Sequence, residues 1–549
     1  TLTGNGIIDV EAGGSLTLSG LVSGNGKLTK HGSGTLVISG SNTYRGGTTI
    51  DQGVLEVASA TALGTGEIRF SKRKAGVSAS IASDVTMSIN DTILLEDSGT
   101  FTPASNTTLS LLQNISGVGT LVQNGAGTLL LAGANNTHGA TEIRSGFLQI
   151  ANNNSLGTGA LSFAASGTGK LRLSTASIAI SNPVKFTGDG IIEIATGQQL
   201  TLQGNIEGAG RLIKQGSGTL ILAAATNSYT GTLRLETGTV RITTADATEL
   251  GGVTFAAGKT ATLSSSKNVS FSGQFSVDGT AIIDTDTNAT ISATSNLTGS
   301  GSINKTGGGT LAFSSDNSSY SGTFSLEGGT ILVQNSSGLG SGDFTFASAG
   351  LGTLTIDGSY SLVNNFILAG DGTVNITANS QATISGILSG SSTFTKTGAG
   401  RLTLSGVNTT SGAIAIQEGV ILITAINNLG DSNLVFPENS NGSLETKGTL
   451  TTSKTVTLTG NGIIDVEAGG SLTLSGLVSG NGRLTKHGSG TLVISANNTY
   501  KGGTTISQGT VAVASSTALS SGPIIFPAGA SGTLSVTSTI ITTKDSLNV

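Results

Sequence analysis

The stretch GNGKLTKHGSGTL, from Gly24 to Leu36, decides the fold because it recurs along the whole chain. Five later copies read GVGTLVQNGAGTL, GAGRLIKQGSGTL, GSGSINKTGGGTL, GSSTFTKTGAGRL and GNGRLTKHGSGTL, and they begin at Gly117, Gly208, Gly299, Gly390 and Gly480. Successive copies are 93, 91, 91, 91 and 90 residues apart. A fixed period of this kind indicates a repeat architecture that grows along one axis rather than a single globular core.

The composition of the 549 residues favours an ordered chain with a long, thin core. Glycine accounts for 84 residues, which would also suit a flexible linker, but 36% of the chain is hydrophobic and its mean hydropathy is +0.18. Enough apolar surface is therefore available to bury, and we expect order rather than disorder. Lys and Arg total 26 against 31 Asp and Glu. This balance provides no basic field for nucleic acid and no polybasic surface for membranes.

Two features that the sequence lacks narrow the class of protein further. The chain has no cysteine, so the sequence predicts neither a disulfide framework nor a cysteine-ligated metal. It also has no run of 18 apolar residues, so we do not expect this segment to insert into a membrane.

Short alternating segments indicate β-strands joined by tight turns. Ile7, Ile8 and Val10 are followed by Leu16 and Leu18, with Gly, Asn, Ser and Asp between such groups, and nothing repeats with the period of a helix. A finer spacing of 20 residues separates the glycines Gly6, Gly26, Gly46 and Gly66. About twenty residues is the length of one coil of a β-helix, in which glycine supplies the corners.

The expected fold class is therefore all-β: a parallel β-helix forming a single elongated rod. Four to five coils per repeat unit give about 25 coils, which at about 4.8 Å each predict a rod of about 120 Å. The predicted units are six, each of about 91 residues, and together they make one continuous solenoid: residues 1–93, 94–184, 185–275, 276–366, 367–456 and 457–549.

Other landmarks recur once per unit. One phenylalanine recurs in every unit, and we expect it to fill the interior: Phe70, Phe163, Phe255, Phe346, Phe436 and Phe526. A leucine precedes each of these: Leu63, Leu156, Leu250, Leu339, Leu429 and Leu519. A tyrosine position accepts threonine in two units, which suggests a rim or a turn: Tyr44, Thr137, Tyr229, Tyr320, Thr410 and Tyr500.

The first and last units are nearly identical. Residues 1–39 match 457–495 except that Lys27 becomes Arg483, and residues 1–70 differ from 457–526 at 13 positions. This similarity predicts a super-repeat of 456 residues, and hence a native chain that continues with further blocks.

The pattern GxGxLxKxGxGTLxLSGxNTYxGGTxIxxGxLxV, read from Gly24 to Val57, resembles the autotransporter-associated β-strand repeat, also called the passenger-associated transport repeat, of bacterial type V secretion proteins. The copies at Gly208–Ile242 and Gly480–Val513 are similar, whereas the other three depart mainly at NTYxGGT. The resemblance implies a right-handed parallel β-helix that is exported across an outer membrane and either displayed on the cell surface or shed from it.

Motifs that would indicate nucleotide or metal chemistry do not satisfy their requirements. Gly252–Thr260 has five residues between its glycines where a phosphate loop needs four, and no helix is expected after it. Calcium-binding nonapeptides with regularly spaced aspartates are absent. His31, His138 and His487 each lack a second ligand nearby, so we expect exposed turn histidines and no metal or cofactor.

Carboxylates offer the best case for an enzyme. Paired acids two residues apart face one side of a strand, and the candidate positions across the units are Asp9 with Glu11, Asp465 with Glu467, Asp284 with Asp286, and a lone Glu193, with Thr102 and Asn375 in the remaining two units. Because a glycan-cleaving site is built once on adjoining coils, we interpret these acids as outward-facing charges. Lys72, Arg73 and Lys74 form the only basic cluster, which we expect on a loop.

The function that follows is structural: a stalk or adhesin segment at the cell surface or in the extracellular space, with no catalytic, cofactor-binding or metal-binding residues. Its partners would be further copies of itself, stacked end to end or side by side, or glycans and proteins of a host or neighbouring cell surface. A polysaccharide-acting β-helix enzyme and an ice- or crystal-binding solenoid are the alternatives, and the second would need a threonine ladder that this sequence does not keep in register.

Overall fold

Each strand of this chain pairs in parallel with a strand one coil further along the sequence. In the computed structural model, Gly6 pairs with Leu28, Leu28 with Thr48 and Thr48 with Ile68, so the register advances by 22, 20 and 20 residues. The structure describes residues 1–549 except 74–75, 245–250, 349, 538–546 and 549. The predicted all-β parallel solenoid of about 25 coils is confirmed.

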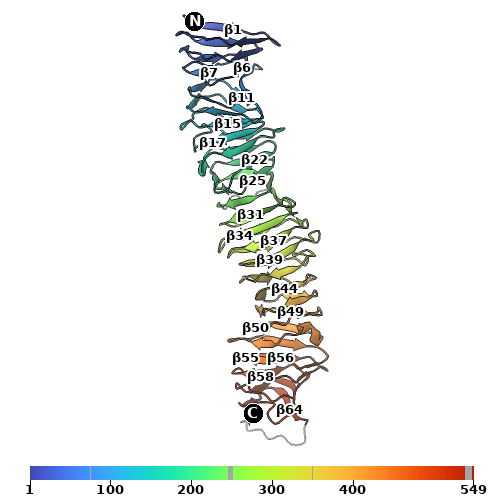
Figure 1. Ribbon diagram of the computed structural model, residues 1–549. Helices are drawn as coiled ribbons and strands as arrows, with labels where there is room; N and C mark the ends of the chain where they lie inside the picture. The colour runs from blue at the N-terminus through green and yellow to red at the C-terminus, as the bar shows by residue number, and fades with distance from the viewer. Residues whose placement is uncertain (74–75, 245–250, 349, 538–546, 549) are drawn as a thin grey trace. The chain divides into compact units, whose positions relative to one another are not determined.

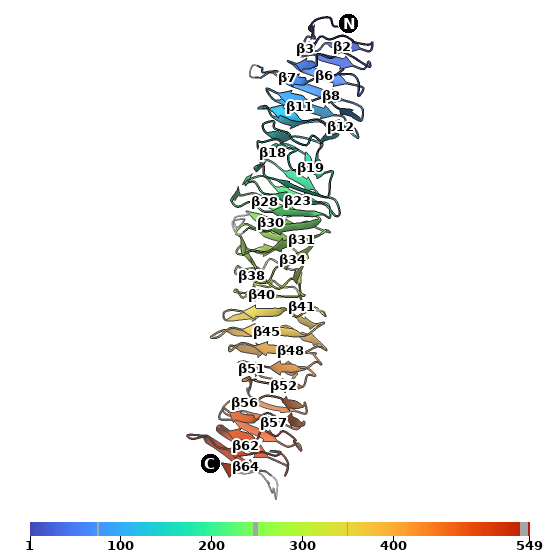
Figure 2. The ribbon, with the colours of Figure 1, turned by 90° about the vertical axis from the view of Figure 1, so that its left-hand side faces the viewer.

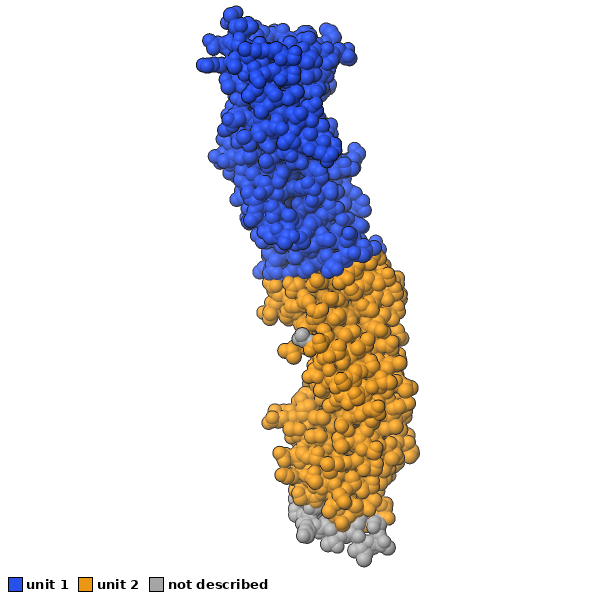
Figure 3. Space-filling model, in the orientation of Figure 1, with its two compact units in different colours: residues 1–274 blue, residues 275–549 orange. Residues whose placement is uncertain are grey.

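The coils form two compact units, Thr1–Gln274 and Phe275–Val549, which Figure 3 shows in blue and orange. Strands run from the blue end of the colour scale through green in unit 1, and from yellow-green to red in unit 2 (Figures 1 and 2). Each unit is described by itself.

Unit 1 contains four runs of hydrogen-bonded parallel strands and, outside these runs, the strand β32(Val269–Phe271). The first run is β1(Gly6–Asp9), β3(Leu28–His31), β5(Thr48–Ile50), β7(Ile68–Phe70), β10(Ile93–Leu95) and β13(Ile115–Gly117). The second is β2(Ser15–Leu18), β4(Thr35–Ile38), β6(Gly53–Val57), β8(Ala79–Ser83), β11(Gly99–Pro103), β14(Leu121–Gln123), β16(Thr141–Ile143), β18(Leu161–Phe163), β21(Val184–Phe186), β24(Ile206–Gly208) and β27(Asn227–Tyr229). The third is β9(Met87–Ile89), β12(Thr108–Leu111), β15(Thr128–Leu131), β17(Phe147–Ile150), β19(Lys170–Leu173), β22(Gly190–Glu193), β25(Leu212–Gln215), β28(Thr232–Leu235) and β30(Gly252–Phe255). The fourth is β20(Ser177–Ile180), β23(Gln199–Leu202), β26(Thr219–Leu222), β29(Gly238–Ile242) and β31(Thr260–Ser265).

Unit 2 contains the parallel pair β33(Phe275–Val277) and β36(Leu297–Thr298) and four longer runs. Its first run is β34(Thr280–Thr285), β37(Ser302–Thr306), β39(Thr323–Leu326), β41(Phe344–Phe346), β44(Phe366–Leu368) and β47(Leu388–Gly390). The second is β35(Thr290–Ala293), β38(Thr310–Phe313), β40(Thr330–Val333), β42(Thr353–Ile356), β45(Gly372–Ile376), β48(Phe394–Thr397), β50(Ile414–Ile416), β52(Leu434–Phe436), β55(Val456–Leu458) and β58(Val478–Gly480). The third is β43(Tyr360–Leu362), β46(Gln381–Ile384), β49(Arg401–Leu404), β51(Val420–Ile423), β53(Ser443–Thr446), β56(Gly462–Val466), β59(Leu484–His487), β61(Thr504–Ile506), β63(Ile524–Ile525) and β65(Leu547–Asn548). The fourth is β54(Thr449–Thr452), β57(Ser471–Leu474), β60(Thr491–Ile494), β62(Gln508–Val513) and β64(Ser531–Val536).

Helical structure is scarce in the part of the chain that the structure describes. The short 3-10 helix η2(Ile426–Leu429) is the helical segment found there. No helix among these residues is long and apolar enough to cross a membrane.

The core is built from alternate residues of the short strands. In β4, Leu36 and Ile38 are fully buried, whereas Thr35 and Val37 point outward. Leu36 pairs with Leu16 on one side and Leu55 on the other, so like side chains stack from coil to coil. Stacked aliphatic side chains fill the interior of each coil, and this burial is the main stabilising contribution.

The predicted interior phenylalanines are confirmed in five of the six repeats. Phe70, Phe163, Phe255, Phe346 and Phe436 are at most 1% exposed, whereas Phe526 is partly exposed. The leucines that precede them are buried as well, apart from Leu250, which lies outside the described residues: Leu63, Leu156, Leu339, Leu429 and Leu519.

The first glycine of each repeat motif meets both conditions that favour glycine. At Gly208, φ is +104° and an added Cβ would lie 2.2 Å from the carbonyl oxygen of Phe186 on the preceding coil. L-residues rarely adopt this φ, and no side chain fits that space. The same relation holds, with φ between +103° and +113°, at Gly24, Gly117, Gly299, Gly390 and Gly480.

Candidate functional site

Several of the acids that were the best case for an enzyme take part in surface ion pairs. The Oδ2 atom of Asp465 lies 3.0 Å from Nδ1 of His487, and Asp9 and His31 make the same contact at 3.2 Å. Glu467 lies 3.3 Å from Lys447. Asp9, Asp465 and Glu467 therefore each lie beside a basic side chain on the surface, where such pairs contribute little to stability.

The acids at the same position in two other repeats also have polar partners. Glu193 contacts Arg172 at 2.8 Å and Lys170 at 3.4 Å. Asp284 accepts a hydrogen bond from the Thr306 hydroxyl at 3.4 Å. Among the described residues no group of three or more His, Cys, Asp or Glu side chains is placed to hold a metal ion.

The predicted basic cluster lies on the loop between β7 and β8, with Lys74 outside the described residues. Arg73 uses its guanidinium to bond the backbone carbonyls of Ser71, Val77 and Ser98. The guanidinium group of Arg73 is therefore engaged in hydrogen bonds to the backbone of this loop and of the next coil.

One histidine prediction is wrong. His31 and His487 are exposed as expected, but His138 is completely buried, with Nε2 2.9 Å from the Thr141 hydroxyl. Burial lowers the pKa of His138 to about 4, so the ring is neutral at physiological pH. The sequence did not reveal this because the ring enters the core at a place set by the neighbouring coils.

The tyrosine position is a core position, so its interpretation as a rim or turn was also wrong. Its members are at most 1% exposed: Tyr44, Tyr229, Tyr320, Thr410 and Tyr500. In the second repeat, residues 94–184, the place belongs to His138 rather than Thr137, because Gly157 packs on the His138 carbonyl as Gly64 packs on that of Tyr44. The Tyr44 hydroxyl lies 2.6 Å from Thr48 Oγ1, and burial raises the pKa of this phenol to about 12.

A lysine in the motif, which the sequence interpretation overlooked, is the most unusual polar group in the interior. Lys30, Lys214, Lys305, Lys396 and Lys486 are all 0% exposed. The Nζ atom of Lys214 donates to the carbonyls of Gln215 at 2.9 Å, Gly216 at 2.5 Å and, on the next coil, Thr237 at 3.2 Å. The other four lysines make the same three bonds.

These ammonium groups are held by neutral carbonyl oxygens instead of a paired carboxylate. Loss of solvation lowers the pKa to about 8 in Lys214, Lys305, Lys396 and Lys486. A glycine on the next coil leaves room for each ammonium group, since a Cβ on Gly238 would lie 2.8 Å from Lys214 Nζ.

In the second repeat, residues 94–184, Gln123 replaces this lysine and also bonds three carbonyls, two of them at the positions that the lysines use. The Nε2 atom of Gln123 donates to the carbonyls of Gly125, Gly127 and Ser145 at 2.9, 3.2 and 3.2 Å. The position therefore requires hydrogen-bond donors, whereas the positive charge is dispensable. The sequence signal for this buried donor is that the six copies of the motif carry either lysine or glutamine at the position.

Buried asparagines join three successive coils in the same way. Asn408 accepts from the Leu388 amide at 2.7 Å and donates to the carbonyl of Asn428 at 2.5 Å. Four more asparagines make both bonds: Asn42, Asn136, Asn317 and Asn498. Together with the buried lysines and Gln123, they form what we call the cross-coil bonds.

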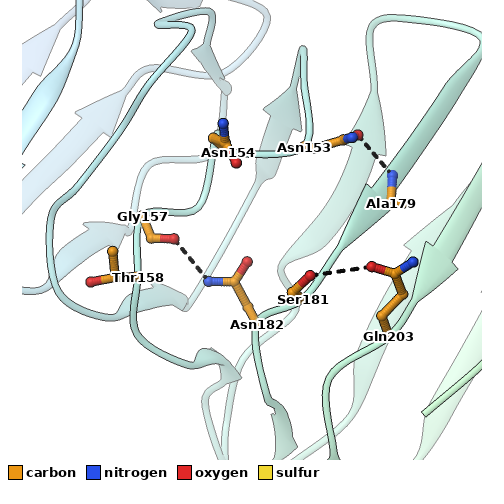
Figure 4. A pocket seen from close by; sticks show the side chains of 8 residues that line it. All are labelled: Asn153, Asn154, Gly157, Thr158, Ala179, Ser181, Asn182 and Gln203. Carbon is orange, nitrogen blue, oxygen red and sulfur yellow. Dashed lines mark hydrogen bonds between the residues drawn. The ribbon is translucent and has the colours of Figure 1, made fainter.

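A polar cavity of about 500 Å³ opens on the surface of unit 1 (Figure 4). Its wall consists of Asn153, Asn154, Gly157, Thr158, Ala179, Ser181, Asn182 and Gln203. The amide of Asn182 donates to the carbonyls of Gly157 and Gly159, at 3.1 and 2.7 Å, and thereby fixes one side of the cavity. None of these eight residues carries an ionisable side chain.

Comparison with known proteins agrees with this architecture. The chain contains six copies of the passenger-associated-transport-repeat, at residues 28–57, 121–150, 212–242, 303–333, 394–423 and 484–513. The predicted resemblance to this repeat is thus confirmed. Each copy begins on the strand that carries the buried lysine or Gln123 and extends into the next coil.

One relative is an adhesin, described as "Adhesin BmaC autotransporter", from Brucella suis biovar 1 (strain 1330). The similarity is 32% identity over 247 residues, which cover 42% of this chain and 7% of the adhesin. The match therefore covers only a small part of that protein's length. No solved structure matches the chain.

Proposed function

We propose that this chain is a stalk segment of an autotransporter-like protein, exported to the bacterial cell surface or released from it, with a structural rather than enzymatic role. The observation that carries the proposal is the recurrence of the cross-coil bonds: the buried lysine or Gln123 makes them in all six repeats and an asparagine in five. An enzyme needs one specialised site, whereas a stalk needs the same bonds at regular intervals along its length.

The chemistry of these bonds suits a scaffold in a harsh environment. Each buried lysine ties its own corner to the next coil, so opening one coil leaves several buried carbonyls without partners. Trypsin-like proteases cleave after lysine, and five lysines are enclosed in the core. Stiffness and resistance to proteolysis are therefore the properties that we assign to the segment.

Adhesion is the finer part of the proposal. The name of the relative and the long repetitive surface support a role in contact with other cells through many weak interactions, which multivalency strengthens. The binding partners that we propose are surface glycans, surface proteins, or further copies of this chain joined end to end or side by side.

The test uses bacteria that produce the full-length protein. Antibodies raised against residues 1–549 should label intact cells, or the protein should appear in the medium. Trypsin applied to intact cells should leave large fragments uncut at Lys214 and Lys305. Labelling only after permeabilisation, with a cytosolic protein as control, would overturn the localisation. Glycan hydrolysis that is lost on Asp284→Asn substitution would overturn the structural role.

A further inference from the structure

Amide side chains follow one corner of unit 1 from coil to coil. Gln113 Nε2 donates to Asn90 Oδ1 at 3.0 Å, and the backbone N–H of Asn135 donates to Asn114 Oδ1 at 3.0 Å. Asn154 Nδ2 reaches Asn135 Oδ1 at 3.5 Å. We call the exposed polar residues at this corner, Asn90, Gln113, Asn114, Asn135, Asn153, Asn154, Ser181 and Gln203, the amide column.

The column ends at the cavity in Figure 4. There Asn153 Oδ1 accepts from the Ala179 amide of β20 at 2.9 Å, and the Ser181 hydroxyl donates to Gln203 Oε1 at 3.2 Å. These bonds fix the orientation of Asn153 and Gln203 without using their NH₂ groups. The cavity is therefore lined by oriented donors, beside the acceptor oxygen of Asn182.

The fold does not require amides at this corner. Asn114 stands three residues before the first glycine of its motif, and the same place holds Leu21, Ile387 and Leu477, which are 64%, 45% and 41% exposed. The residue before the buried asparagine is Asn135 in one unit and the 64% exposed Val407 in another. Since the solenoid tolerates exposed aliphatic side chains at these two positions, packing does not explain why Asn114 and Asn135 are amides.

The lining defines the chemistry of a matching ligand. A phosphate or carboxylate group would need a cation, and the cavity wall holds none; an apolar ligand would need apolar walls. Vicinal hydroxyl groups both donate and accept hydrogen bonds, as side-chain amides do. Because coils repeat every 4.8 Å or so, an extended chain of sugars could meet similar partners on successive coils.

We propose that the cavity and the amide column bind a neutral oligosaccharide or polysaccharide chain, with Asn153 and Gln203 as the principal donors. This proposal names a ligand class for the adhesion proposed above and rests on that function for its biological setting. The binding itself can be measured on the purified chain.

The test is direct binding by the purified chain of residues 1–549. Neutral probes are mannan, dextran, cello-oligosaccharides and chito-oligosaccharides, and acidic probes are hyaluronate and heparin. We expect at least one neutral probe to bind, with an affinity that is insensitive to salt, since no ion pair forms. Binding to acidic probes alone, or to none, would overturn the proposal.

Variants locate the site. Asn153→Ala combined with Gln203→Ala should weaken the neutral probe about tenfold or more, because two donors are lost. Asn497→Ala removes an exposed asparagine at the equivalent corner of another unit and should leave affinity unchanged. Unchanged circular dichroism would show that both variants fold. Equal affinities in the wild type and the double variant would refute the assignment, whatever the outcome of surface labelling.

Discussion

Lys214 Nζ donates to the carbonyl oxygen of Thr237, 23 residues later and one coil further along, at a distance of 3.2 Å. The bond joins a completely buried ammonium group to the corner of its neighbour. It recurs in the other units that carry lysine at this position, with partners at Gln52, Gly328, Glu418 and Gln508.

Replacing Lys214 separates the role of its donors from that of its charge. Lys214→Met leaves three buried carbonyls without partners, and we expect the local stability to fall by about 3 kcal/mol. Lys214→Gln should stay within about 1 kcal/mol of the wild type, as the native Gln123 indicates. Hydrogen exchange of β25 and β28 measures the local opening free energy. Equal protection in both variants would contradict the assignment.

Alkaline pH should reveal the buried charge. The pKa of Lys214 is about 8 in the folded chain, and the unfolded value is about 10.4. Between these values the unfolded chain holds a proton that the folded chain has released, so stability rises with pH across this window. We expect the urea midpoint of the wild type, relative to Lys214→Gln, to rise from about pH 8 to about pH 10.4. A constant difference would show that the ammonium group is not desolvated.

Acid pH should weaken the second repeat through His138. The folded pKa is about 4, whereas an unfolded histidine titrates near about 6.5. As pH falls from about 6.5 to about 4, the unfolded chain takes up a proton that the folded chain refuses, so up to about 3 kcal/mol of local stability is lost.

His138→Tyr places the residue of the other repeats at this position, and it should abolish that loss in hydrogen exchange of β16 and β18. His487→Asn alters an exposed ring and serves as the control, because exposed ion pairs contribute little. Acid sensitivity that persists in His138→Tyr would assign the effect to carboxylates instead.

Asn408→Ala tests the asparagine cross-coil bonds. The substitution leaves the Leu388 amide and the Asn428 carbonyl unpaired inside the protein, which should cost about 2 kcal/mol. The neighbouring Val407→Ala, at an exposed side chain, should change stability by less than about 0.5 kcal/mol. Exchange of the Leu388 amide proton reports directly on the bond, and equal rates in both variants would show that Asn408 is dispensable.

The carboxylates show where sequence reasoning stops at the candidate site. Spacing along a strand placed Asp465 and Glu467 on one face, but it did not reveal that His487 and Lys447 would lie beside them. The polar cavity was also not foreseen, since its residues come from three separate coils between Asn153 and Gln203. Residues about twenty positions apart in the sequence lie in contact on adjacent coils. Such contacts can be predicted only when the register between the coils is known.

The sequence by itself determined the parallel solenoid. Glycines such as Gly208 recur where a corner needs positive φ and close backbone approach, and alternating residues such as Leu36 and Ile38 fill the space between corners. These requirements are local, so they can be recognised in the amino-acid sequence alone. Tertiary structure alone decided that Lys214 and His138 point inward, because a polar side chain enters the core only where adjoining coils supply its partners.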